Sequence, residues 1–81
     1  MKANFITIEQ FRAARALLGW SRAELAKRSG LSEPTVKRVE MEEGPNVSDD
    51  ARQKLRSTLE AAGVTFTNDG APGVKLKKKG K

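Results

Sequence analysis

Apolar side chains recur at helical spacing over most of the chain and at strand spacing near its end. One face of a helix predicted over residues 8–18 carries Ile8, Phe11, Ala14, Leu17 and Leu18. Shorter apolar stripes predict three further helices, over residues 22–29, 33–42 and 49–62. After Gly63 the period changes to two, in residues 64–67 and 74–77. These two segments, separated by turn residues, predict a β-hairpin.

Polar residues at the predicted helix ends support these boundaries. Thr7 with Gln10 forms a capping box, in which the hydroxyl accepts a first-turn N–H and the amide reaches back to the cap. Ser21 with Glu24 repeats this capping box, and Ser32 and Ser48 are expected to cap the third and fourth helices. An isolated hairpin is marginal in water. Its apolar face should therefore pack on the helices or on the strands of a second chain, through Val64, Phe66, Val74 and Leu76.

The length and composition exclude several classes of protein. With 81 residues the chain makes one domain and has no room for a separate effector domain. The sequence has no Cys and no His, which excludes zinc sites built on those residues, disulfides and His-activated nucleophiles. No apolar stretch approaches the roughly 20 residues that span a bilayer. We expect a soluble cytoplasmic protein that is not an enzyme and has no metal or cofactor.

The net charge of +6 is concentrated at the end of the chain. Five of the six charges belong to the lysines at 75, 77, 78, 79 and 81, which leaves +1 for residues 1–73. Like-charge runs of this kind are usually solvated, so residues 78–81 are expected to form a basic disordered tail. The charge predicts a polyanionic partner, but only for non-specific binding.

The strongest signal is the spacing between the second and third predicted helices. Ala26, the fifth residue counted from Arg22, is small enough to let the two helices cross closely. Gly30, the ninth residue, can adopt the positive φ that reverses the chain. The apolar seam between the helices is supplied by Leu25, Leu31, Val36 and Val39. This spacing predicts a helix-turn-helix.

The segment from Phe11 to Glu40, within a likeness that covers roughly residues 7–62, resembles the Xre/Cro family of bacterial and phage repressors. The resemblance implies a mainly α fold: a four- to five-helix repressor-like helix-turn-helix domain over residues 7–63. The hairpin over 64–77 follows it and, with the fourth helix, is the expected dimerisation element if it does not pack on its own chain alone. It also implies a structural ion pair between Arg15 and Glu40. Two departures are an Arg at position 22, where the family often has Gln, and a region over 42–48 that reads as loop.

By the same resemblance the exposed start of the third helix enters the major groove. Base contacts are expected from Ser32, Glu33, Pro34, Thr35, Lys37 and Arg38. Phosphate contacts are expected from Ser21 and Arg22, at the start of the second helix, and from Lys75 and Lys77. Each has a structural alternative: the serines cap helices without DNA, Glu33 suits a helix N-terminus, and Arg38 can be a solvated surface residue.

These observations predict a sequence-specific repressor that binds a palindromic site on double-stranded DNA as a homodimer. An antitoxin-like protein, which binds a toxin partner through its lysine-rich end and represses the shared promoter, is the alternative. RNA binding ranks third, because a helix-turn-helix suits a wider major groove than A-form RNA offers.

Overall fold

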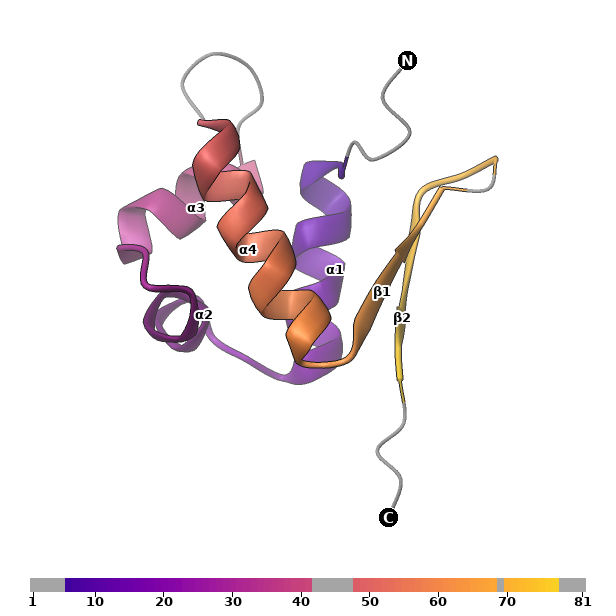
Figure 1. The fold of residues 1–81 in the computed structure, drawn as a ribbon, viewed down its shortest axis with the longest axis horizontal. Helices are drawn as coiled ribbons and strands as arrows, with labels where there is room; N and C mark the ends of the chain where they lie inside the picture. Colours follow the sequence, from indigo (N-terminus) through magenta and orange to yellow (C-terminus); the bar gives the residue numbers. More distant parts are fainter. Residues whose placement is uncertain (1–5, 42–47, 69, 78–81) are drawn as a thin grey trace.

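The computed structural model describes residues 6–41, 48–68 and 70–77 (Figure 1). Along these ranges the elements are α1 (Ile8–Leu18), α2 (Arg22–Ser29), α3 (Glu33–Met41), α4 (Asp49–Ala61), β1 (Val64–Thr67) and β2 (Gly73–Leu76). The mainly helical fold with a helix-turn-helix and a C-terminal antiparallel hairpin is confirmed. In Figure 1, α2 and α3 lie on one side of α1 and α4, and the hairpin lies on the other.

The element boundaries follow the sequence closely. Two differ by one residue: α4 ends at Ala61 rather than at 62, and β2 spans Gly73–Leu76 rather than 74–77. The expected end of the third helix at 42, the basic tail over 78–81 and most of the expected loop over 42–48 lie outside the described residues.

Helix ends are stabilised by the residues that the sequence singled out. Thr7 and Gln10 form both halves of the capping box, with N···O distances of 3.1 and 2.9 Å. Ser21 and Ser48 each accept the backbone N–H three residues later. Gly30, at the end of α2, has φ 80°, the left-handed conformation that an L side chain disfavours.

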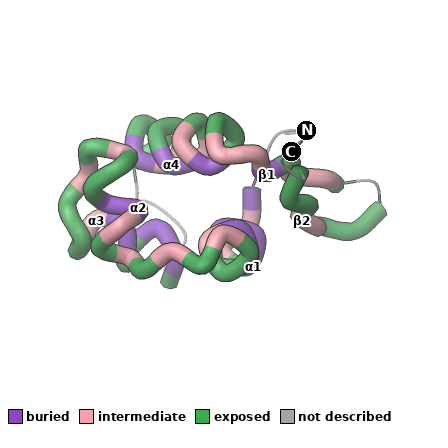
Figure 2. The backbone as a smooth tube through the Cα atoms, turned by 90° about the horizontal axis from the view of Figure 1, so that it is seen from below, coloured by how far each residue is buried: buried purple, intermediate pink, exposed green. Residues whose placement is uncertain are grey.

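One core joins the four helices to the hairpin. Figure 2 shows the buried segments turned toward the space between α1, α4 and the α2–α3 pair. Phe11 from α1 packs edge-on against Phe66 from β1, with ring centroids 6.0 Å apart. The buried apolar side chains are Ile6, Phe11, Ala14, Leu25, Ala26, Val36, Val39, Ala51, Leu55, Leu59 and Val64.

Leu17 is an exception to the predicted apolar face of α1. Its exposed fraction is 46%, so its assignment to the buried face was wrong. At 100° per residue Leu17 stands about a quarter turn from the centre of the face that carries Phe11, Ala14 and Leu18. The width of the buried stripe is set by the neighbouring elements, and they do not cover this position.

The hairpin packs on the helices of its own chain. Val64 is buried, and Phe66 and Val74 pack against the core. The strands pair in register, with Val64 opposite Leu76 and Phe66 opposite Val74. Leu76, expected on the same apolar face, keeps an exposed fraction of 39% because it lies at the end of β2.

Gln10 has a second role that its place in a capping box did not reveal. Its side-chain nitrogen donates to the carbonyl oxygens of Thr67 and Gly73, at 3.0 and 2.9 Å. These two residues face each other across the hairpin, next to its turn. With an exposed fraction of 3%, the amide thus joins the start of α1 to both strands.

We predict that Gln10→Glu destabilises the protein by about 2–4 kcal/mol at neutral pH. A carboxylate can still accept from Thr7, but it cannot donate to the two carbonyl oxygens and must be buried beside them. Urea unfolding followed by circular dichroism measures the change. The control is Glu9→Gln, at the exposed neighbouring position, with an expected change below about 0.5 kcal/mol. A Gln10→Glu protein as stable as the wild type would contradict the role of the amide donor.

Candidate nucleic-acid interface

α2 and α3 form the predicted helix-turn-helix. Leu25 and Ala26 from α2 are buried, as are Val36 and Val39 from α3. The turn between the helices closes where the backbone N–H groups of Gly30 and Leu31 both donate to the carbonyl oxygen of Ala26, at 2.9 and 3.1 Å. The small side chain of Ala26 and the positive φ of Gly30 therefore act at the same point of the chain, as the spacing required.

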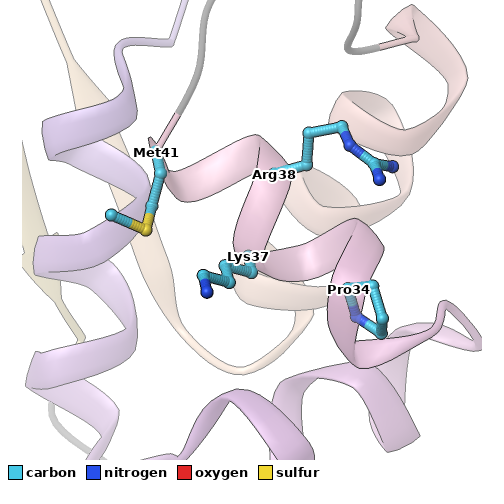
Figure 3. A pocket seen from close by; sticks show the side chains of 4 residues that line it. All are labelled: Pro34, Lys37, Arg38 and Met41. Atoms are coloured by element: carbon cyan, nitrogen blue, oxygen red, sulfur yellow. The ribbon is translucent and has the colours of Figure 1, made fainter.

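The opposite face of α3 is open. Pro34, Lys37, Arg38 and Met41 follow one another at helical spacing and line a hollow of about 450 Å³ (Figure 3). All four residues are exposed, and neither Lys37 nor Arg38 forms an ion pair within the described part of the chain. Sequence reasoning missed Met41; the signal was its position seven residues after Pro34, two turns along the same face.

The start of α3 is held by a local network of hydroxyl groups. Ser32 Oγ accepts the backbone N–H of Thr35 at 3.2 Å, and the two side-chain oxygens are 2.8 Å apart. Glu33, in the first turn, is exposed and favourably placed relative to the helix dipole. The Ser32 hydroxyl is thus engaged with the first turn of α3, and the Thr35 hydroxyl is engaged with Ser32.

A single buried carboxylate holds the inner face of α3, the face turned toward α1 and α2. Glu40 is fully buried and accepts from Arg15 Nε at 2.7 Å and from Arg15 Nη2 at 3.1 Å. This is the pair that the resemblance implied. Arg15 Nη1 also donates to the carbonyl oxygen of Trp20 at 2.9 Å, in the connection between α1 and α2. Without a partner, the buried charge of Glu40 would lose its hydration and destabilise the fold. The hydrogen bonds from Arg15 offset this loss.

Arg22 is the third member of this cluster, which the sequence did not suggest. Its Nε lies 3.2 Å from Glu40 Oε1, and its side chain keeps an exposed fraction of 35%. The first residue of α2 is therefore tied to the end of α3. Ser21, the exposed N-cap of α2, precedes it directly. The structure thus joins the start of α2 to the helix that carries the expected base contacts.

Lys75 and Lys77 are not brought to this interface. They belong to β2 and the residue after it, on the far side of α1 and α4 from α2 and α3 (Figure 1). The expected phosphate contacts accordingly divide into two groups, one at the start of α2 and one on the hairpin.

The described ranges hold no group of three or more His, Cys, Asp or Glu side chains placed to bind a metal ion. None of the helices found there is long and apolar enough to cross a membrane.

We predict that Arg15→Ala lowers the free energy of unfolding by about 3–5 kcal/mol, and Arg22→Ala by only about 1 kcal/mol. Arg15 is the less exposed side chain and makes two hydrogen bonds to Glu40, whereas Arg22 makes one and is partly solvated. Urea unfolding measures both changes. Arg12→Ala, which removes an exposed guanidinium 4.0 Å from Glu9, is the control with little expected effect. Equal losses for the two cluster variants would refute this order.

The comparisons with known proteins agree with this geometry. A family model described as helix-turn-helix matches residues 11–49, which include most of α1, all of α2 and α3 and the first residue of α4. A search of curated proteins found no match. The matched region contains the helix-turn-helix seam, the open face of α3 and the cluster around Glu40. Residues 11–49 therefore belong to the Xre/Cro-like helix-turn-helix family of DNA-binding transcription regulators.

Proposed function

We propose that the protein is a sequence-specific transcriptional repressor that reads the major groove with α3. One observation carries the proposal: the inner face of α3 is buried in the core, and its outer face presents exposed cations that have no ion-pair partner among the described residues. Val36, Val39 and Glu40 are buried on one side, whereas Lys37 and Arg38 are exposed on the other. A rigid helix with exposed donors matches the width of the major groove and its base edges.

The side chains of α3 suit different bases. Arg38 can donate to both O6 and N7 of guanine, and Glu33 can accept from the amino group of cytosine. The methyl group of Thr35 and the ring of Pro34 offer apolar contacts to thymine. Lys37 and Ser32 complete the proposed base contacts. Ser21 and Arg22 bind a phosphate, with Arg22 held in place by its bond to Glu40.

The proposal includes a homodimer on a palindromic site. A single helix-turn-helix reads few base pairs, and two copies related by a dyad roughly add their binding free energies. We assign the dimer surface to α4 and the hairpin, a choice supported by the exposed apolar side chain of Leu76. A cytoplasmic location in a bacterium or phage belongs to the same proposal. The antitoxin-like alternative stays a prediction, since the lysine-rich end on which it rests is described only to Lys77.

Selection from a random pool of duplexes supplies the site for the first test. On that site Arg38→Ala is expected to weaken binding by about 1–3 kcal/mol, and on random DNA by much less. Fluorescence anisotropy at one fixed salt concentration measures both affinities. Arg12→Ala, on the exposed side of α1, serves as the control. Equal losses on the two duplexes would show that Arg38 does not read bases.

The symmetry of the selected sites tests the dimer. We expect palindromes whose half-site centres lie about 34–36 Å apart, one helical turn. Sedimentation equilibrium should give twice the monomer mass of 8.9 kDa. Asymmetric sites bound by a monomer would contradict the homodimer.

A further inference from the structure

In the part of the chain that the structure describes, the cationic side chains that form no ion pair and no hydrogen bond lie in two separate places. Most cations of the helices are paired: Arg12 with Glu9, Arg28 with Glu24, Lys54 with Asp50, Arg56 with Glu60, and both Arg15 and Arg22 with Glu40. Within the described ranges, these unpaired lysine and arginine side chains form two groups. One is Lys27, Lys37 and Arg38 on α2 and α3, and the other is Lys75 and Lys77 at the hairpin.

The pairing of the strands explains why the two hairpin lysines face solvent. Lys75 is opposite Thr65 in the register, and both are exposed. The backbone N–H of Lys77 donates to the carbonyl oxygen of Gly63 at 2.8 Å, so the ladder and its alternation continue for one more pair. Lys75 and Lys77 therefore share the outer face of the hairpin, about 7 Å apart.

This outer face is distant from the recognition helix. Figures 1 and 2 both show the hairpin at one end of the molecule and α2 and α3 at the other, with α1 and α4 between them. Gln10 and Val64 hold the hairpin against the helices in this position. A duplex that receives α3 in its major groove, about 12 Å wide, meets the first group of cations and leaves the second group at the far end of the domain.

We propose that the outer face of the hairpin is a second, sequence-independent DNA contact, which binds the backbone of a duplex segment other than the one read by α3. Three further lysines follow it in the sequence, at 78, 79 and 81, and residues 74–81 contain no acid. A run of cations without acids suits a polyanion such as the DNA backbone. The proposal rests on the proposed function in one respect: once α3 is bound, other segments of the same DNA are present at high effective concentration.

A capture experiment with the full-length protein tests this second contact. One duplex with the selected site is fixed to beads, and a labelled random duplex of about 20 base pairs, two helical turns, is in solution. At about 50 mM salt the wild-type protein should retain the labelled duplex on the beads. The double variant Lys75→Gln with Lys77→Gln should lower this capture at least about tenfold. The slope of the logarithm of the capture affinity against the logarithm of the salt concentration should become shallower by about 2. Its affinity for the immobilised site should stay within about twofold of wild type.

The matched control changes the net charge by the same two units elsewhere: Arg12→Glu, at an exposed position of α1, should leave capture unchanged. Two results would overturn the proposal. Undiminished capture by the lysine variant would mean that the hairpin does not hold the second duplex. An equal loss of affinity for a single duplex would mean that the lysines and α3 contact the same segment.

Failure of the proposed function gives a different result. In that case the wild-type protein shows no preference for any site. Beads that carry random duplex would still capture the labelled random duplex, and this capture would still depend on the two lysines. Base reading by α3 would then be refuted. The second contact would stand in that case.

Discussion

The fold depends on the pairing of one buried carboxylate. Glu40 is fully buried at the end of α3, where an ionised side chain without partners would be strongly destabilising. Arg15 from α1 and Arg22 from α2 donate three hydrogen bonds to it, and Arg15 also binds the carbonyl oxygen of Trp20. One charge thus determines the mutual position of three helices. Apolar packing at Val36 and Val39 turns this face of α3 toward the core, and the directional bonds to Glu40 add a fixed geometry to it.

This arrangement places the helix-turn-helix in a binding-competent form before any partner arrives. The inner side of α3 is held by the seam and by Glu40, and its first turn by the bond from Thr35 to Ser32. If α3 binds DNA as proposed above, little backbone ordering would oppose the binding.

The charged side chains of the hairpin differ from those of the helices in how they are paired. Charges on the helices are mostly paired, whereas Lys75 and Lys77 stay unpaired on its outer face, within the described residues. Gln10 and Val64 decide where this face lies, because they attach the strands to α1 and to the core. The net charge of +6 therefore does not describe a uniform field around the molecule. Lys75 and Lys77 place two of its charges at the end opposite α2 and α3.

The sequence by itself determined the elements and the helix-turn-helix, since caps, glycines and apolar periods act over a few residues. Thr7 and Gly30 mark helix ends through their own backbone and side-chain chemistry, and Ala26 marks the helix crossing. Only the tertiary structure decided that Arg22 joins Arg15 on Glu40, that Gln10 holds the hairpin and that Leu17 is exposed. Gln10 and Gly73 are 63 positions apart, and such contacts depend on how the elements pack. A periodic pattern shows which face is apolar, but the neighbours that cover this face determine its limits and its polar partners.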